Sequence, residues 1–531
     1  MMNMKNSDET EQSAIPQQPK LTWLLAWALV FGSAARLLPV LAAEMPVNDG
    51  GLFYSMAQEI QAANFALPAF TTYNHAEIPF AYPPLGLYLA ALTGLALPLT
   101  QVIRWLPPLI SILTIPAFFA LAREILPSKR RAAIAVAAYA LLPASYELVI
   151  MGGGLTRAAG LFFSLLTLLN AWRLFQQFSL RWMLVTALTA SLLILSHPTI
   201  AIHTALGILT FWLFAKHKRQ NLIAGLGVTG LSLIFTAPWW GTVGARHGLE
   251  PFLNAMHTGG DWSSLLVPLL LIDFGHELFL ELIMLLAFVG ILWLIARRQY
   301  LIPLWFSVLF LVGRNAFLDA AIPVGMAASF GIADVLWGGF RSLKQNSRPA
   351  RFPAFSRSEK ILFALLLLYP TIAALTSSTS IAHLHVSPIE QEALNWVAEN
   401  TPPESRFLLL THGSPVNTPV QEWFPALTAR TSLTVVQGYE WLPGEQFSKR
   451  MAAYNALQPC LTQNLACVED WAAARGYTYE YLYIFRGEVG QESVSAEQTL
   501  WAGWILEDLS ARPDYRQVYD TPLIQIYKRE N

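Results

Sequence analysis

Charged residues are scarce in this chain of 531 residues. They make up 13% of the sequence, whereas hydrophobic residues make up 54%. An average soluble domain has roughly 25% charged residues. This balance excludes an ordinary soluble globular protein and predicts a membrane protein with soluble parts. The formal net charge is −1. Because the basic residues form short clusters and no broad basic face, the composition also excludes a nucleic-acid-binding protein.

The sequence also lacks the patterns that mark nucleotide and metal sites. No cluster of Cys and His has the spacing of a structural metal site. The three glycines at 152–154 are followed by Leu155 and Thr156, and not by the Lys-Ser or Lys-Thr of a phosphate-binding loop. A nucleotide-sugar enzyme is therefore disfavoured. No cofactor is required by these patterns, although a divalent cation stays an option.

Cysteine is nearly absent, with Cys460 and Cys467 as the two occurrences. A disulfide between them would suit an oxidising compartment. Two buried free thiols are the alternative, and a single pair of cysteines does not decide between the two.

Long apolar runs predict a polytopic α-helical membrane protein. A helix needs about 20 apolar residues to cross the hydrocarbon core of a bilayer. We predict about eleven transmembrane helices, at residues 21–43, 106–126, 132–150, 158–178, 182–196, 199–215, 221–239, 278–296, 300–313, 320–338 and 361–378. Residues 1–20 are polar, and no cleavage-site pattern follows the first apolar run, so we expect a disordered cytoplasmic tail and a retained anchor.

Clusters of Lys and Arg predict which side of the membrane each loop faces. Cytoplasmic loops carry an excess of basic residues. Five such clusters fall on one side of the predicted helices, at residues 123–131, 173–181, 216–219, 297–298 and 341–360. The N-terminus is then cytoplasmic. The first outward loop, residues 44–82, and everything after about residue 380 are extracytoplasmic.

The apolar stretch at residues 83–103 could add a crossing and so change the side of the basic residues that follow it. Pro98, Pro107 and Pro108 interrupt this region, and proline disrupts a helix interior. We therefore predict a short helix from Pro83 to Leu97 that lies at, or partly in, the outer interface.

The first outward loop contains acidic residues but no basic ones. Neither Lys nor Arg occurs between residues 37 and 103, whereas Asp49 lies just before an amphipathic pattern at residues 52–60. This pattern predicts a helix along the membrane surface. Asp49 then has a structural interpretation, as the N-cap of that helix, and a functional one, as a general base. The two are compatible, because the helix dipole keeps the carboxylate ionised.

From about residue 381 the composition changes to that of a soluble α/β domain of residues 381–531. An amphipathic helix is predicted at 389–398 and another helix at 496–509, with strands at 406–411, 477–485, 515–519 and 523–527. A domain of this size can form a core of its own. Residues 423–430 read as ordinary core and connections.

The order of these features resembles a known class of enzyme. An N-terminal span, Asn48-Asp49-Gly50-Gly51, an amphipathic helix and Tyr82-Pro83-Pro84-Leu85 are similar to the polytopic GT-C glycosyltransferases, and within them to the bacterial protein O-mannosyltransferase and aminoarabinose transferase type. The likeness is architectural over residues 21–380, and it extends to motifs within residues 44–86.

This resemblance implies a reaction and a role for Asp49. A hexosyl or pentosyl group is transferred, with inversion, from a polyprenyl-phosphate donor to a hydroxyl of a glycan, lipid or protein at the outer face of the membrane. The acidic residue of the first outward loop activates or orients the acceptor, and by position that residue is Asp49. Many relatives place a basic residue before the Pro-Pro pair, whereas this chain has Tyr82, so the phosphate contact must come from elsewhere.

A leaving polyprenyl phosphate needs a fixed cation or several oriented donors. Arg157 is one candidate, because it follows the glycines at an outward helix start. Arg314 is another, because it interrupts an apolar stretch. The structural alternatives are an Arg157 that extends to lipid headgroups and a salt bridge from Arg314 to Asp319.

Four further residues are predicted substrate contacts. Asn48, Tyr54 and Tyr82 lie in the first outward loop, and His197 lies at an outward break between two predicted spans. A single membrane histidine can equally be a hydrogen-bonded structural group.

Two other classes of function stay open at this stage. A multi-pass transporter or flippase of a lipid-linked substrate would be expected to have inverted repeats, and we find none in the sequence. A membrane-anchored binding protein would carry its activity in the domain of residues 381–531, where no nucleophile constellation is evident.

Overall fold

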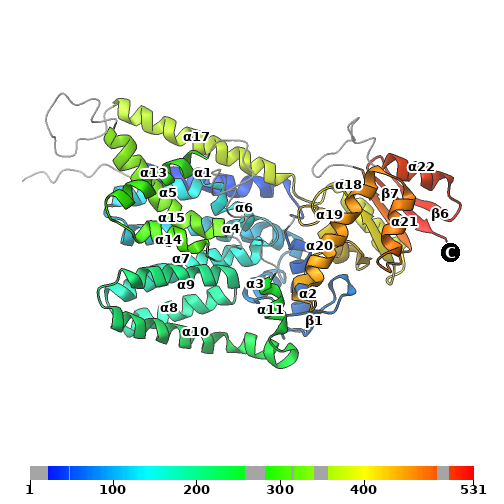
Figure 1. Ribbon diagram of the computed structural model, residues 1–531, viewed down its shortest axis with the longest axis horizontal. Helices are drawn as coiled ribbons and strands as arrows, with labels where there is room; N and C mark the ends of the chain where they lie inside the picture. The colour runs from blue at the N-terminus through cyan, green and yellow to red at the C-terminus, as the bar shows by residue number, and fades with distance from the viewer. Residues whose placement is uncertain are drawn as a thin grey trace, which may run out of the picture.

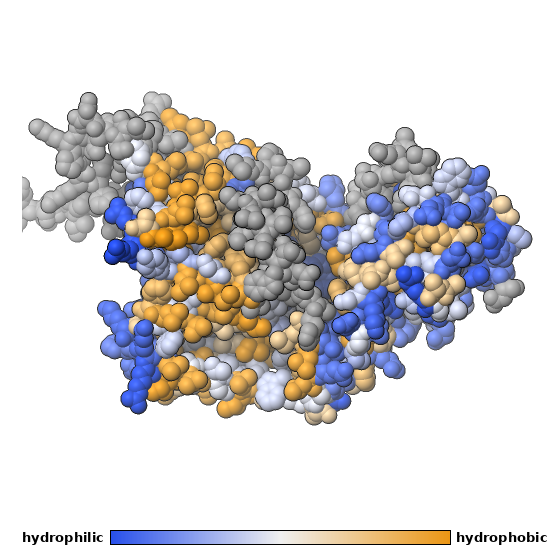
Figure 2. Space-filling model, viewed as in Figure 1, coloured by the Kyte–Doolittle hydropathy of each residue, from blue (hydrophilic) through white to orange (hydrophobic). Residues whose placement is uncertain are grey.

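The computed structural model describes residues 22–46, 48–257, 281–311, 316–339, 357–486 and 502–530. Figure 1 shows long helices packed side by side, with a smaller part that contains a β-sheet at one end of them. In Figure 2 the helical part is largely hydrophobic on its surface and the sheet-containing part is largely hydrophilic. The chain is thus a polytopic helical membrane protein with a C-terminal sheet-containing region.

The helical part holds most of the predicted spans as separate helices. Its helices are α1 (Thr22–Ala42), α2 (Gly50–Ala62), α3 (Leu85–Thr93), α4 (Leu99–Ile125), α5 (Lys129–Leu141), α6 (Glu147–Ile150), α7 (Gly154–Gln176), α8 (Leu180–Ile194), α9 (Pro198–Leu213), α10 (Lys218–His247), α11 (Glu250–His257), α13 (Leu282–Ala296), α14 (Leu301–Leu309), α15 (Ala316–Phe330), its π-helical extension η3 (Gly331–Leu336) and α17 (Arg357–Ala382). Short 3-10 turns, η1 (Tyr73–His75) and η2 (Pro143–Ser145), and a two-stranded antiparallel ribbon of β1 (Phe70–Thr71) and β2 (Ile78–Pro79) complete it.

Each of the eleven predicted spans overlaps at least one helix, as far as the described residues cover them, and the span at 132–150 overlaps two. Within the described part of the chain, six helices are long and apolar enough to cross a membrane, or seven if the bent pair of α5 and α6 counts as one span. The helices α8, α9 and α13 are apolar but shorter.

The prolines around residue 100 do not break the chain where we expected. Helix α4 begins at Leu99 and runs through Pro107 and Pro108 to Ile125, so its predicted start at residue 106 was wrong. The extra turns bury Val102 and Ile103 against the first-loop helices, and this burial offsets the missing backbone hydrogen bonds. Helix α3 has nine residues, about 14 Å at 1.5 Å per residue, which is too short to cross a bilayer.

The predicted span at 132–150 is bent, and the reason is local. Helices α5 and α6 meet at an angle of 85° across Pro143, which has no N–H to continue the helix. The carbonyl groups next to the break find new donors: the hydroxyl of Ser145 donates to Tyr139 O, and the guanidinium of Arg36 donates to Ala140 O. The predicted span at 132–150 is therefore present as two helices separated by a bend.

The C-terminal region contains a five-stranded mixed sheet in the order β4-β3-β5-β7-β6. Its elements are α18 (Pro388–Asn400), β3 (Arg406–Leu410), α19 (Pro419–Thr428), β4 (Thr431–Ser432), η4 (Tyr439–Trp441), α20 (Gln446–Leu457), η5 (Gln458–Thr462), α21 (Leu465–Ala473), β5 (Tyr481–Phe485), α22 (Gly503–Ala511), β6 (Tyr515–Asp520) and β7 (Ile524–Arg529). Strands β4, β3 and β5 are parallel, whereas β7 and β6 pair antiparallel. The predicted strands agree with β3, β5, β6 and β7; of the predicted helix at 496–509, residues 496–501 lie outside the described residues.

The side chains of the central strands point alternately into two hydrophobic cores. Successive side chains of a strand point to opposite faces. In β3, Leu408 and Leu410 enter a core formed within the C-terminal region. Phe407 and Leu409, on the other face, belong to a cluster that also contains Leu52 of α2 and other members of residues 44–82. The C-terminal region thus shares one of its two cores with residues 44–82.

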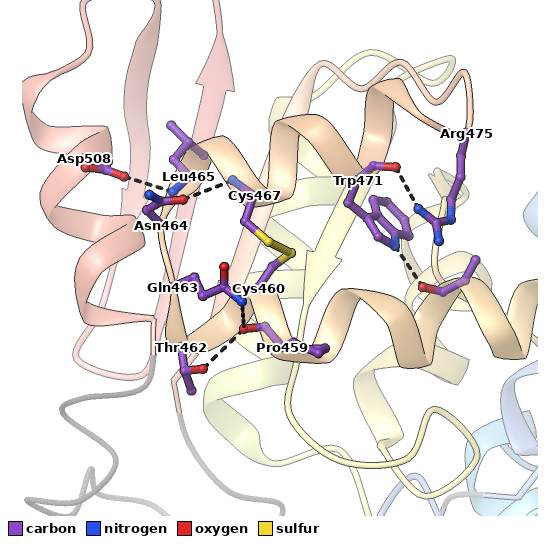
Figure 3. Close-up of a disulfide and its surroundings, with 11 residues drawn as sticks. Pro459, Cys460, Thr462, Gln463, Asn464, Leu465, Cys467, Trp471, Arg475 and Asp508 are labelled. Carbon is purple, nitrogen blue, oxygen red and sulfur yellow. Dashed lines mark hydrogen bonds between the residues drawn. A yellow bond between two sulfur atoms is a disulfide. The ribbon is translucent and has the colours of Figure 1, made fainter.

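Cys460 and Cys467 form a disulfide between η5 and α21 (Figure 3), which settles the alternative that the sequence left open. The side chain of Asn464 accepts a hydrogen bond from Cys467 N and so caps α21. The bond closes a short loop next to that cap, on the side of the sheet that faces the internal core.

Candidate active site

Asp49 lies at the N-terminal end of α2, as predicted, but its side chain does not cap the helix. Asn48 and Asp49 both have positive φ, 85° and 66°, a region that Asn and Asp tolerate better than other residues. No hydrogen bond from α2 reaches the Asp49 side chain as a cap. Its carboxylate instead lies 3.7 Å from Nη2 of Arg157. Two residues that the sequence proposed separately, one acidic and one basic, are therefore ion-paired.

The glycines at 152–154 make this pairing possible by allowing close approach. A Cβ at Gly152 would lie 2.5 Å from the Cα of Gly50, and a Cβ at Gly153 would lie 2.2 Å from the carbonyl oxygen of Asn48. Any side chain at these positions would push the loop away from α7. Gly152 and Gly153 thus allow the close packing that sets Arg157 beside Asp49.

Arg157 is mostly buried and retains hydrogen-bonding capacity. Its side chain is 12% exposed, and the Asp49 side chain is 23% exposed. Nε and Nη1 of Arg157 are buried and have no hydrogen-bond partner among the described residues. Nδ2 of Asn48, from the same loop, is in the same state. Buried donors in proteins are normally paired, so these three N–H-bearing atoms can serve an acceptor-rich ligand.

Tyr82 lies close to this pair. It is buried, and its ring packs edge-on against Phe53 and Trp441. Burial, and then the negative charge of Asp49, raise the pKa of Tyr82 to about 12, although Arg157 opposes this shift. The phenol is therefore neutral and can donate a hydrogen bond. It cannot supply the positive charge that a basic residue at this position would.

Tyr54 is on the same helix as Phe53 but faces the C-terminal region. Its ring lies 5.8 Å from that of Trp423, and its hydroxyl accepts a hydrogen bond from Gln58. Burial raises the pKa of the Tyr54 hydroxyl. The structure thus places Tyr54 between α2 and α19.

Sequence reasoning missed a residue that binds three backbone N–H groups of the Asp49 loop. Glu422, in α19 of the C-terminal region, is fully buried. Its carboxylate accepts hydrogen bonds from the backbone N–H groups of Asn48, Asp49 and Gly51, at 2.8, 2.9 and 3.2 Å. Burial, followed by the charge of Asp49, raises the pKa of Glu422 to about 8. No local pattern marks Glu422, because its partners lie more than 370 residues away in the sequence.

His197 has a structural role in this arrangement. Its ring caps α9 by accepting a hydrogen bond from Ile200 N. It packs against α7 at Gly160, where a Cβ would lie 2.9 Å from the Cβ of His197, one helical turn beyond Arg157. Its predicted contact with substrate stays a prediction.

Arg314 lies outside the described residues. Asp319, the residue that could pair with it, is buried in α15 and lies 2.5 Å from Nδ1 of His203 in α9. This pair links two helices of the membrane part. Among the residues that the structure describes, no group of three or more His, Cys, Asp and Glu side chains is arranged to hold a metal ion.

The helical part, helix α2 with its acidic loop and the sheet-containing C-terminal region together have the same fold as two solved membrane proteins, ArnT and the arabinofuranosyltransferase AftD. The structure is similar to that of ArnT from Cupriavidus metallidurans in the apo state, with a TM-score of 0.53 and 16% identity over 96% of this chain and 97% of that one.

The same protein bound to undecaprenyl phosphate gives a TM-score of 0.53 at 15% identity over 96% of this chain and 97% of that one. The arabinofuranosyltransferase AftD from Mycobacteria gives a TM-score of 0.53 at 14% identity and covers 96% of this chain but 40% of that one. No protein-family model matches the sequence, and no curated protein matches it. At these identities the likeness concerns the fold.

Proposed function

We propose that the protein is an inverting membrane glycosyltransferase that moves a sugar from a polyprenyl phosphate to an acceptor hydroxyl. The observation that carries this proposal is the Asp49–Arg157 pair, in which the arginine has two buried N–H-bearing atoms left over. ArnT, which has a similar fold, has been solved with undecaprenyl phosphate bound, and this supports a lipid-linked donor here.

Asp49 and Arg157 divide the chemistry between them in this proposal. Asp49 takes the proton of the acceptor hydroxyl, whose oxygen forms a bond to the anomeric carbon while the bond from that carbon to the phosphate oxygen breaks. The electron pair leaves with the polyprenyl phosphate. Arg157 binds the phosphate through its open N–H groups and stabilises the charge that develops there. The neutral hydroxyl of Tyr82 and the amide of Asn48 are further donors to the sugar phosphate.

The proposed site lies at the end of the helices that faces the C-terminal region. Three contacts define this end: Leu85 N donates to Leu195 O, Arg246 donates to Leu67 O, and Gly152 packs against Gly50. The turns after α7 and α9, which carry the basic clusters at 173–181 and 216–219, therefore lie at the opposite end. By the positive-inside rule that opposite end is cytoplasmic, and the site and the C-terminal region are extracytoplasmic.

Transfer by reconstituted protein tests the proposal. The purified protein in liposomes is incubated with candidate polyprenyl-phosphate sugars and acceptors, and release of the lipid phosphate is followed by mass spectrometry. We expect Asp49→Asn to lower the rate by about 10² to 10⁴, as for a lost general base. We expect Arg157→Gln to lower it by about 10² to 10³, as for a lost charge-stabilising donor.

Arg173→Gln is the matched control, because Arg173 lies on the same helix and is also ion-paired, to Glu124. It is about 24 Å further along α7, at 1.5 Å per residue, so this variant should transfer at the wild-type rate. An undiminished rate in Asp49→Asn would refute the assignment of the base. Flux of a lipid-linked substrate without release of lipid phosphate would favour a transporter or flippase instead.

A further inference from the structure

Helix α2 receives its N-terminal cap from a residue of the C-terminal region. The first N–H groups of any helix lack partners within the helix, and a side-chain acceptor next to the first turn commonly satisfies them. Here the acceptor is Glu422, which binds the N–H of Gly51 in the first turn as well as those of Asn48 and Asp49 before it. Three consecutive or near-consecutive amides are thus held by one buried carboxyl group.

This arrangement leaves the Asp49 side chain available for Arg157. An aspartate at the N-cap position would ordinarily bind the first-turn amides itself. Because Glu422 occupies that place, the Asp49 carboxylate points to α7 instead, where it forms the ion pair at 3.7 Å. The structural and functional interpretations of Asp49 are therefore separated, and the capping role falls to a different residue.

The backbone of α19 is fixed against the same loop by other contacts. Tyr73 donates to the carbonyl oxygen of Glu422 at 2.6 Å, and the indole of Trp423 donates to Pro46 O at 3.0 Å. A Cβ at Gly51 would lie 2.4 Å from the carbonyl oxygen of Glu422, so the two segments touch with no space for a side chain. The position of Glu422 therefore determines the position of the loop closely.

We propose that Glu422 is a positioning residue of the glycosyl-transfer site, through which the C-terminal region holds Asp49 in its reactive orientation. This rests on the proposed function. It gives the C-terminal region a part in catalysis. Removal of the carboxylate releases the amides of the loop, and Asp49 then turns to cap α2 and leaves Arg157.

The test compares Glu422→Gln and Glu422→Ala with Glu390→Gln in the full-length reconstituted protein. Glu390 is a matched control: it is also buried in the C-terminal region and also caps a helix, but its partner is Ser387 at the start of α18. Two measurements are made on each protein. One is hydrogen–deuterium exchange of peptides that cover residues 44–56, and the other is kcat and KM for the donor.

We expect faster exchange of the residue 44–56 peptides in both Glu422 variants and unchanged exchange in Glu390→Gln. We expect kcat to fall by about 10- to 100-fold in Glu422→Gln, since a displacement of about 1 Å can cost 10² in rate, while the donor KM changes by less than threefold. Glu422→Ala should lose more, because it leaves no acceptor for any of the three amides.

The outcomes separate this proposal from the proposed function. Unchanged exchange in both Glu422 variants would show that Glu422 does not hold the loop at residues 48–51, whatever the activity of the protein. Faster exchange with a wild-type kcat overturns the link to catalysis. A wild-type protein that releases no lipid phosphate from any donor overturns the proposed function, whereas the exchange measurement still decides whether Glu422 holds the loop.

Discussion

At the scale of single residues, the site depends on how burial distributes charge around Asp49. Asp49 is close to a cation, Arg157, and to a buried carboxyl group, Glu422, whose backbone carbonyl accepts a hydrogen bond from the Tyr73 hydroxyl. The proximity of Asp49 and the burial of Glu422 both favour the protonated form of Glu422, whereas its three backbone amides favour the ionised form. The balance raises the pKa of Glu422 to about 8.

This raised pKa predicts a pH-dependent stability. In the unfolded chain the pKa of Glu422 is near its ordinary value of 4.5, whereas in the folded protein it is about 8. Between these values the folded state binds the proton that the unfolded state has lost, so the free energy of unfolding decreases as the pH rises. The contribution of Glu422 is complete below about pH 4.5 and is lost by about pH 8. Thermal unfolding of the wild type and of Glu422→Gln from pH 4.5 to 9 measures it.

The difference between the two proteins is what the experiment reports. Glu390, whose pKa burial raises to about 7, contributes a slope of the same sign in both proteins and so cancels. The midpoint of the wild type should fall towards high pH more steeply than that of Glu422→Gln. Parallel curves over the whole range would show that Glu422 does not titrate in this window.

At the scale of elements, the sequence predicted which segments are helices better than how they end and bend. Hydrophobic length identified the spans because lipid demands closed backbone hydrogen bonding over each crossing. The start of α4 was predicted at the wrong residue and the bend after α5 was not predicted, because both are decided by tertiary partners. Val102 and Ile103 extend α4 by burying against α2, and Arg36 stabilises the bend at Pro143 from a different helix. A proline in the sequence shows that one backbone N–H is missing. It does not show whether a residue from another helix satisfies the carbonyl group that this leaves without a donor.

The bend predicts that Arg36 is essential for stability. Arg36 is fully buried and donates to Gly32 O, Ala140 O and the hydroxyls of Ser111 and Ser145. Arg36→Met keeps the bulk but leaves these acceptors unsatisfied, so we expect the free energy of unfolding to fall by about 3 kcal/mol. Thermal unfolding in detergent measures this change. Arg123→Met, at an exposed position of α4, is the control and should change the midpoint little.

At the scale of the whole molecule, the site is assembled from three distant parts of the chain. Asp49 and Arg157 could be proposed from the sequence, because each is an isolated charge in an apolar context. Glu422 could not be proposed, because the residues around it in the sequence have the pattern of an ordinary core helix. Its partners are in residues 48–51, and only the folded structure brings the two segments together. Residues 423–430 read as plain core for the same reason, although Trp423 donates directly to that loop.

The same assembly predicts how the molecule lies across the membrane, and the chain offers a direct test. Both native cysteines are joined in the disulfide, so a cysteine introduced elsewhere is the one free thiol of the chain. Lys216→Cys, in the basic turn between α9 and α10, should resist a membrane-impermeant maleimide in intact cells and react after permeabilisation. Cys460 and Cys467 should react in intact cells once a reducing agent has opened their bond, because the positive-inside rule predicts that their region is outside the cytoplasm. Labelling of Lys216→Cys in intact cells would show that the topology is the inverse of the predicted one. The Asp49–Arg157 site would then be on the cytoplasmic face, and a lipid-linked donor would have to reach it from the inner leaflet.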